Sequence, residues 1–226
     1  MGANRGLPAI SSLANAVLKT ADGAEIVAST LWQSQPLAVL ILRRPGCVLC
    51  RDEAQRLWTL KPQFDQLGVG LVCVIHEWIP REVTAFTAGF WPGPLYHDTS
   101  KAFYAALNGG TPLRGSIWGL LNPLGATWQR IRAASRRVAE HNLVGDGFTM
   151  GGAMVLRRGG GGGAGGGGDG EEGGSGGRGS GGSGGGVAWM HVESDIGLVA
   201  YPEAVLAAAR EVVEAEKAEA AKGGKE

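Results

Sequence analysis

The six residues Leu37–Leu42 (LAVLIL) contain no polar side chain. A strand without alternating polar and apolar residues is typical of the centre of a sheet that is covered on both faces. A Pro-Gly pair then breaks the chain, and apolar residues recur at close to helical spacing over 47–67, with Gly68 expected to cap the helix. Because a second apolar run follows at 69–75, this order predicts a parallel strand pair joined by a right-handed crossover.

The rest of the chain supplies further elements of an α/β fold. The segments 148–156 and 187–192 are expected to pair as an antiparallel hairpin. Other expected elements are a short strand over 95–97, a helix over 100–107 capped by Asp98, and helices over 80–90, from 122 or 123 to 141, and over 202–219. The order βαβα, extra helices and ββα predicts a thioredoxin-like fold, with a central mixed sheet of four to five strands flanked by helices.

A glycine-rich tract interrupts the predicted hairpin. Twenty of the 28 residues over 159–186 are glycine. Such a segment cannot bury an apolar face, so we expect a disordered insertion at the hairpin tip. The tract lacks G-x-x-x-x-G-K-[ST], and no nucleotide cofactor is expected. The chain is therefore predicted to consist of an N-terminal extension (1–17), one thioredoxin-like domain (18–222) interrupted by 159–186, and a tail (223–226).

Charge and cysteine content limit the partners and the compartment. The 21 basic and 21 acidic side chains balance, which gives no electrostatic reason to expect nucleic acid as a partner. No apolar run approaches the roughly 20 residues of a spanning helix, so no membrane insertion is expected. Three cysteines do not resemble a secreted disulfide framework and favour a reducing, cytoplasmic location. The first 21 residues lack acids, which leaves a plastid or mitochondrion as the alternative if upstream residues were trimmed.

The C-x-x-C motif of Cys47 and Cys50 lies between the apolar strand and the predicted helix. Unpaired N–H groups and the helix dipole favour an anion at this place. Together with Arg43, Arg44 and Arg51 nearby, they are expected to lower the pKa of Cys47 below the value of about 8.5 of a free thiol. Cys47 is therefore the predicted thiolate. Cys50, one helical turn further on, is placed to attack an oxidised Cys47 and form a disulfide.

Other interpretations of the motif stay open at this point. A structural zinc site needs two further ligands, and the chain offers only histidines that are scattered singly, so no metal is expected. Those histidines are His76, His97, His141 and His191. The two cysteines can also be small buried residues that fall three apart by chance, and Cys73 is expected to be an inert core residue. Gly151 and Gly152 predict either close approach of the backbone to the dithiol or a β-bulge.

Several segments together resemble the peroxiredoxin-like 2 family, within the alkyl hydroperoxide reductase/thiol-specific antioxidant superfamily. They are LKTADGAEIVASTLW, LILRRPGCVLCRDEAQRL, FDQLGVGLVCVI, PLYHDTSKAFYAAL and NLVGDGFTMGGAMVL. The resemblance covers about 18–156 and resumes at Val187. The family that the chain resembles includes a prostamide/prostaglandin F synthase branch. It implies a thioredoxin fold, a redox pair formed by Cys47 and Cys50, no bound cofactor, and thioredoxin supplied by NADPH as the external reductant.

Two positions depart from the pattern of related families. Typical peroxiredoxins have Thr or Ser three residues before the peroxidatic cysteine, and here that position is Arg44. Peroxide activation is then weak or depends on Arg43 or Arg44 as a donor, and Arg44 joins Cys47 and Cys50 as a candidate catalytic residue. Thioredoxins have a cis-proline before the third core strand, but 148–151 contains no proline.

The predicted function is that of a thiol-dependent oxidoreductase that reduces peroxides or lipid endoperoxides. One alternative is a glutaredoxin- or thioredoxin-like protein disulfide reductase, which the missing proline disfavours. Another is a non-catalytic thioredoxin-fold binding module, in which Cys47 would be unreactive towards peroxide.

Overall fold

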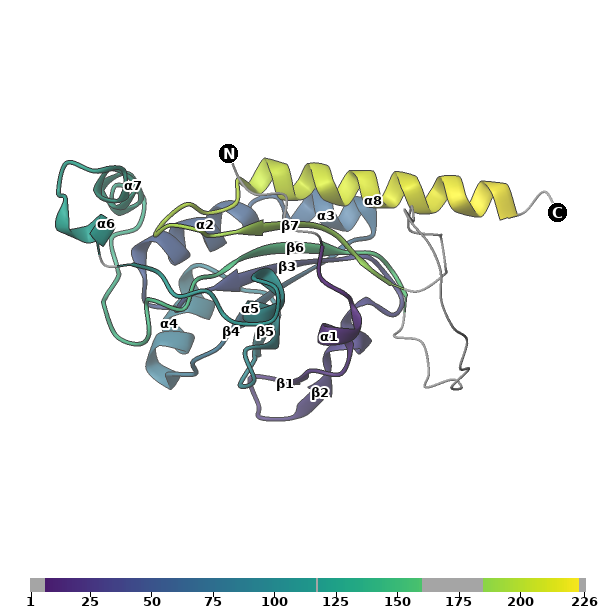
Figure 1. Ribbon diagram of the computed structural model, residues 1–226, viewed down its shortest axis with the longest axis horizontal. Coiled ribbons are helices and arrows are strands. Elements are labelled where there is room, and N and C mark those ends of the chain that lie inside the picture. The colour runs from purple at the N-terminus through teal and green to yellow at the C-terminus, as the bar shows by residue number, and fades with distance from the viewer. Residues whose placement is uncertain (1–6, 117, 160–184, 224–226) are drawn as a thin grey trace, which may run out of the picture.

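The computed structural model describes residues 7–116, 118–159 and 185–223 (Figure 1). The strands are β1 (Val17–Lys19), β2 (Glu25–Val27), β3 (Leu37–Leu42), β4 (Gly70–Ile75), β5 (Leu95–His97), β6 (Gly152–Leu156) and β7 (Val187–Val192). The helices are α1 (Ser11–Ala14), α2 (Val48–Trp58), α3 (Lys61–Leu67), α4 (Pro80–Gly89), α5 (Ala102–Leu107), α6 (Trp118–Leu121), α7 (Ala126–Ser135) and α8 (Pro202–Gly223), with a 3₁₀ turn at Ala28–Trp32.

All the named strands join one mixed sheet in the order β2-β1-β5-β4-β3-β6-β7. The predicted parallel pair of β3 and β4 is confirmed, with Leu37 opposite Gly70 and Leu42 opposite Ile75. The sheet has seven strands rather than four or five, because the β1–β2 hairpin extends it beyond β5. A single antiparallel pairing, between Lys19 and His97, makes that connection.

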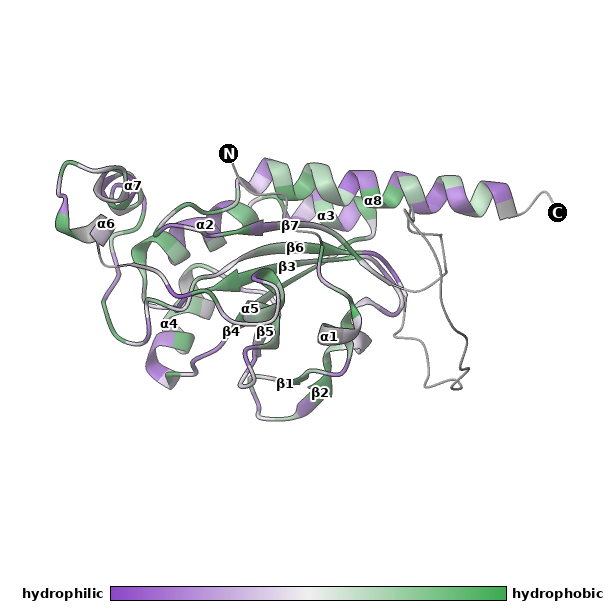
Figure 2. Cartoon of the chain, viewed as in Figure 1, coloured by the Kyte–Doolittle hydropathy of each residue, from purple (hydrophilic) through white to green (hydrophobic). Residues whose placement is uncertain are grey.

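The central strand β3 is buried on both faces, as its composition predicted. Ala38, Leu40 and Leu42 face one core cluster together with apolar residues of α2 and α8. The alternate residues, from Leu37 to Ile41, face a second cluster with α1 and α5. Figure 1 shows α2, α3 and α8 on one side of the sheet, and Figure 2 shows hydrophobic residues concentrated on the central strands. Because both faces are covered, no position of this strand accepts a polar side chain at low cost.

The expected long helix over 47–67 is divided into two, which corrects the prediction. Helix α2 ends at Trp58 and α3 begins at Lys61, with Pro62 in its first turn. Proline has no backbone N–H, so it fits the start of a new helix better than the interior of a continuous one. Gly68 caps α3 in the left-handed conformation (φ 69°), as predicted.

The helix predicted from 122 or 123 to 141 is also shorter than expected. Helix α7 covers Ala126–Ser135, and the residues after it form a loop. Tertiary contacts hold this loop: Arg137 Nη2 pairs with Asp52 Oδ2 at 2.8 Å, and the Asn142 N–H donates to the Gly46 carbonyl at 2.9 Å. These two contacts hold the loop against α2 and against the turn that precedes it.

The predicted hairpin of β6 and β7 is confirmed, although its first arm begins at Gly152 rather than at position 148. Most of the glycine-rich tract, residues 160–184, lies outside the described residues. Helix α5 begins at Ala102 rather than at Ser100, with Lys101 at its N-cap position. Asp98 still contributes to the start of this helix, because its Oδ2 accepts the Phe103 N–H at 2.9 Å. Within the described chain, no helix combines the length and apolar character needed to cross a bilayer.

Candidate active site

The dithiol lies where β3 ends and α2 begins, as the sequence predicted. Cys47 occupies the N-cap position of α2 in an extended conformation (φ −74°, ψ 133°), and Cys50 lies in the first turn. Both thiols are free, and the two residues are 5% and 2% exposed. The carboxyl ends of β3, β4 and β5 share this edge of the sheet, which is the usual location of functional sites in open α/β sheets.

The surroundings of the two thiols give them opposite protonation preferences. A hydrogen bond from the Cys50 thiol, the charge of Arg43 and the Cys50 backbone N–H hold the pKa of Cys47 well below its usual value, although burial opposes them. The pKa of Cys50 is raised well above its usual value, because its thiol donates that hydrogen bond and is buried. The geometry therefore favours a thiolate on Cys47 and a neutral thiol on Cys50.

The three arginines near the motif have different partners. Arg43 Nη2 lies 3.5 Å from Cys47 Sγ. Arg44 donates to the carbonyls of Val144 and Gly145, at 3.4 and 3.1 Å, and its charge contributes less than that of Arg43 to lowering the pKa of Cys47.

Arg51 turns away from the thiolate, contrary to expectation. Its Nε donates to the Pro45 carbonyl at 2.8 Å, and its Nη2 pairs with Glu82 at 3.3 Å. Its contacts fasten the turn before α2 and the loop after α7, since it also donates to the Glu140 carbonyl.

A buried carboxylate, which the sequence did not reveal, holds Arg43. Glu193 directly follows β7, and its Oε2 lies 3.0 Å from Arg43 Nε, in an ion pair whose geometry is not that of a linear hydrogen bond. Its Oε1 accepts the Gly197 N–H at 2.7 Å. Burial raises the pKa of Glu193, while Arg43 opposes that rise. The guanidinium is thus shared between a carboxylate and Cys47, and it also donates to the Gly147 carbonyl at 3.3 Å.

Glu53 is a second buried acid that sequence reasoning missed. It lies on α2, three residues after Cys50, and it is 5% exposed. Burial first, and the nearby Glu193 second, raise the pKa of Glu53 well above its usual value. A signal was present in the sequence: residues 50, 53, 54 and 57 fall at i, i+3, i+4 and i+7, so Glu53 shares the buried face of the helix with Cys50.

Two glycines allow the strands beneath the site to approach closely. A Cβ on Gly151 would lie 2.1 Å from the Ile41 carbonyl oxygen, and one on Gly152 would lie 2.1 Å from the His191 carbonyl oxygen. The register shift of the hairpin occurs at Val155/Leu156 instead, so the interpretation of these glycines as a β-bulge was wrong.

Cys73, His76, His97 and His191 have contacts with groups other than the two thiols of the motif. Cys73 is buried within β4, and burial raises its pKa. His76 is buried with its ring 5.0 Å from that of Tyr104, whereas His97 and His191 contact the carbonyls of His76 and Leu198. Over the described ranges, no three His, Cys, Asp or Glu side chains come together as a metal site would require.

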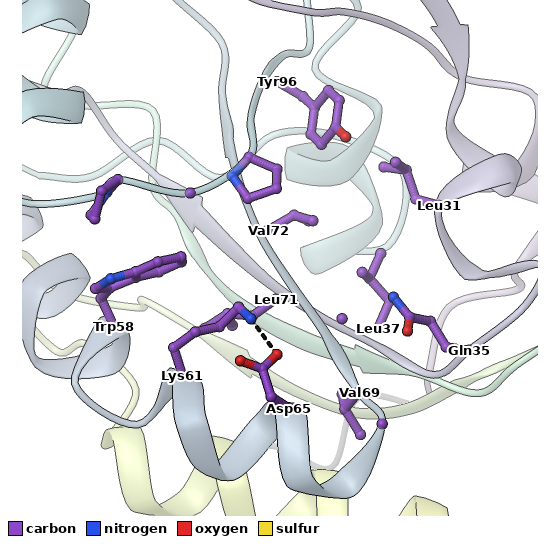
Figure 3. A pocket seen from close by; sticks show the side chains of 15 residues that line it. Leu31, Gln35, Leu37, Trp58, Lys61, Asp65, Val69, Leu71, Val72 and Tyr96 are labelled. Atoms are coloured by element: carbon purple, nitrogen blue, oxygen red, sulfur yellow. Dashed lines mark hydrogen bonds and ion pairs between the residues drawn. The ribbon is translucent and has the colours of Figure 1, made fainter.

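A cleft of about 500 Å³ opens at the other edge of the sheet (Figure 3). It is lined by the first residues of β3 and β4, by the segment before β5, and by Trp58 and Tyr96. Lys61 and Asp65 on α3 pair with each other at its side. Because β3 and β4 are parallel, their first residues lie away from Cys47, which is not part of this cleft.

Comparisons with known proteins agree with the fold. The family model of the AhpC/TSA antioxidant enzymes matches residues 56–163, which begin after the dithiol. Peroxiredoxin-like 2A of Danio rerio is 35% identical over 206 residues, which cover 90% of this chain and 82% of that protein. Peroxiredoxin-like 2A of Xenopus laevis is 39% identical over 132 residues, or 58% of this chain, and this match spans about half (55%) of the relative's length.

Solved structures show the same fold at low sequence identity. Peroxiredoxin Q of Xanthomonas campestris superposes with a TM-score of 0.54 at 15% identity, covering 92% of this chain and 97% of that one. Peroxidoxin BcpB of Mycobacterium tuberculosis gives a TM-score of 0.50 at 13% identity, covering 87% and 92%. Fold and family together support a thiol-dependent, peroxidase-type oxidoreductase. The chain belongs to the peroxiredoxin-like 2 family and has the thioredoxin-like fold of the peroxiredoxins.

Proposed function

We propose that this protein reduces peroxides or lipid endoperoxides, with Cys47 as the attacking thiolate and Cys50 as the resolving thiol. The observation that carries the proposal is the asymmetry of the pair. Cys47 accepts the Cys50 thiol proton in a hydrogen bond and has Arg43 Nη2 at 3.5 Å, while Cys50 is a buried donor. A stabilised thiolate next to a neutral thiol is the starting state that the reaction requires.

The chemistry proceeds in three steps: an oxidation by the peroxide, a condensation of the two cysteines, and a reduction. The Cys47 thiolate attacks a peroxide oxygen, the O–O bond breaks, and Cys47 becomes a sulfenic acid. Cys50 then displaces the hydroxyl group from that sulfur, which forms a disulfide and releases water. An external dithiol restores the thiols. We assign this role to thioredoxin supplied by NADPH, in a cytoplasmic location, with no cofactor bound to the protein itself.

Arg43 is the better candidate than Arg44 for activating the peroxide. Its guanidinium lies at the sulfur, so an N–H group directed at the developing alkoxide would stabilise charge in the transition state. Arg44 instead donates to two carbonyls of the loop after α7. In this proposal Arg44 orders that loop and supplies a secondary positive charge, and it replaces the Thr or Ser of typical peroxiredoxins only in position.

The surface beside the site favours an organic peroxide over a purely polar one. Leu143 and Val144 are 83% and 51% exposed on the loop that Arg44 holds. An apolar substituent of a lipid peroxide can lie against such side chains while its peroxide group enters. We therefore expect organic hydroperoxides to be reduced faster than hydrogen peroxide.

Thiol-trapping mass spectrometry on the reduced protein tests the proposal. After addition of an organic hydroperoxide or hydrogen peroxide, we expect one disulfide, between Cys47 and Cys50. The Cys50→Ser variant should stop at the Cys47 sulfenic acid, and Cys73→Ser should match wild type because its thiol is buried in β4.

Retention of full peroxidase activity by Cys47→Ser would refute the proposal. Failure to react with either peroxide, together with ready exchange with oxidised glutathione, would favour the protein disulfide reductase instead. A Cys47 thiol inert to both reagents would favour the non-catalytic binding module.

A further inference from the structure

Glu53 is a buried carboxyl with an unused oxygen beside the dithiol. Its residue is 5% exposed, and one carboxyl oxygen accepts the Ala200 backbone N–H. Its Oε1 has no hydrogen-bond partner among the described residues. Residues three apart on a helix have Cβ atoms about 5–6 Å apart, so the free oxygen belongs to the same face of α2 as the Cys50 thiol. Buried polar atoms of this kind are rare and call for a chemical explanation.

The charges around Glu53 explain why it holds a proton while the dithiol is reduced. The charged groups that influence Glu53 are Arg43 directly after β3, Glu193 directly after β7, and Cys47 at the N-cap of α2. Glu53 in turn influences Cys73 of β4. With Cys47 as a thiolate and Glu193 as a carboxylate, the buried Arg43 already faces two negative charges. A third buried negative charge would lack a partner and would be costly.

Oxidation of Cys47 removes one of those negative charges. A sulfenic acid or a disulfide is neutral, so Arg43 is left with Glu193 as its remaining anionic partner in contact. The charge balance of the reduced site is restored if Glu53 loses its proton at that point.

We propose that Glu53 is the proton store of the dithiol, protonated when Cys47 is a thiolate and ionised when Cys47 and Cys50 form a disulfide. This proposal rests on the proposed function. In the first step the leaving alkoxide takes the Glu53 proton and departs as an alcohol. In the second step the Glu53 carboxylate takes the Cys50 thiol proton, the S–S bond forms as the S–O bond breaks, and the departing hydroxide receives that proton and leaves as water.

Reduction returns the proton. An external dithiol supplies two electrons and two protons; one proton restores the Cys50 thiol, the other returns to Glu53, and Cys47 becomes a thiolate again. The site therefore carries the same net charge in its reduced form and in its disulfide form.

Infrared difference spectroscopy of the full chain tests this assignment. The disulfide is formed with a thiol oxidant and then reduced with dithiothreitol, so the measurement does not depend on peroxidase activity. In wild type, reduction should produce the C=O band of a protonated carboxylic acid that shifts in D₂O. The band should be lost in Glu53→Gln, retained at a shifted frequency in Glu53→Asp, and unchanged in Glu203→Gln, which removes an exposed glutamate.

Absence of the band in wild type, or its persistence in Glu53→Gln, would overturn the proposal. Loss of the band in Glu193→Gln but not in Glu53→Gln would assign the proton to Glu193, and this result would also overturn the proposal. If Cys47 is inert to peroxide while the band behaves as expected, the proposed function fails and the proton store stands.

A kinetic measurement separates proton transfer from a structural effect. Positioned acid–base groups contribute about 10²–10⁴-fold to proton transfer, so closure of the disulfide from the Cys47 sulfenic acid should slow about 100-fold or more in Glu53→Gln. Alkylation of Cys47 should stay near the wild-type rate, because a neutral amide replaces a neutral acid next to the thiolate. Equal slowing of both reactions, or of neither, would contradict the role of Glu53 in proton transfer.

Discussion

Replacing Arg43 with methionine should raise the pKa of Cys47. Two opposite unit charges 3.5 Å apart, the distance from Nη2 to Sγ, attract each other by about 5 kcal/mol at an effective dielectric constant of about 20. Glu193, 3.0 Å from Nε, offsets much of that charge. We therefore expect about 1–3 kcal/mol to remain, which corresponds to a rise of about 1–2 pKa units.

The substitution needs a compensating change, because it leaves Glu193 buried without its ion pair. Breaking one partner of a buried pair costs about 3–5 kcal/mol. The double variant Arg43→Met/Glu193→Gln removes both charges and keeps the volumes similar. Arg44→Met is the matched control, since its guanidinium is held by loop carbonyls and its charge influences Cys47 less.

The assay is the rate of Cys47 alkylation by iodoacetamide as a function of pH, read by mass spectrometry of the Cys47 peptide. The midpoint of the rate profile gives the pKa of Cys47. The double variant should shift this midpoint upward by about 1–2 units, and Arg44→Met should shift it upward by less. An unchanged midpoint in the double variant, or a larger shift in Arg44→Met, would refute the assignment of Arg43 as the principal cation of the site.

Three further outcomes follow from the packing. Gly151→Ala should destabilise the protein by about 1–3 kcal/mol in chemical denaturation, because its Cβ would meet a carbonyl oxygen of β3 at 2.1 Å. Gly89 has open space around it, so Gly89→Ala should not destabilise the protein. Tyr104→Phe should cost about 1–3 kcal/mol by leaving the last carbonyl of β3 without the hydroxyl that donates to it, and an unchanged midpoint would disprove this. The raised pKa of Glu53 means that the stability it contributes to the reduced protein is present below about pH 4.5 and is lost as pH rises through the folded-state pKa. The free energy of unfolding of Glu53→Gln should accordingly equal that of wild type near pH 4. At alkaline pH it should be larger than that of wild type by about 1.4 kcal/mol per unit of pKa shift. A variant that is less stable than wild type at high pH would contradict this.

Much of the fold was predictable from the sequence because local residue patterns define its central elements. An uninterrupted apolar run, a Pro-Gly break and helical spacing define β3, its turn and α2 within a short stretch, and burial on both faces leaves few other arrangements for such a strand. Features that depend on distant contacts were not predictable. Strands β1 and β2 have three residues each and join the sheet through one pairing with β5, and the end of α7 is set by contacts to α2.

The sequence by itself determined the two cysteines, their spacing and their place at a helix start, since these depend on neighbouring residues. Tertiary structure decided which arginine meets the thiolate. Arg43 and Arg44 are adjacent in the chain, yet one is directed at Cys47 and the other at the loop after α7. It also brought Glu193 to the site from far along the chain and buried Glu53 beside Arg43. Burial and the distances between charges govern the chemistry of such groups, and both quantities exist only once the sheet and its helices have packed.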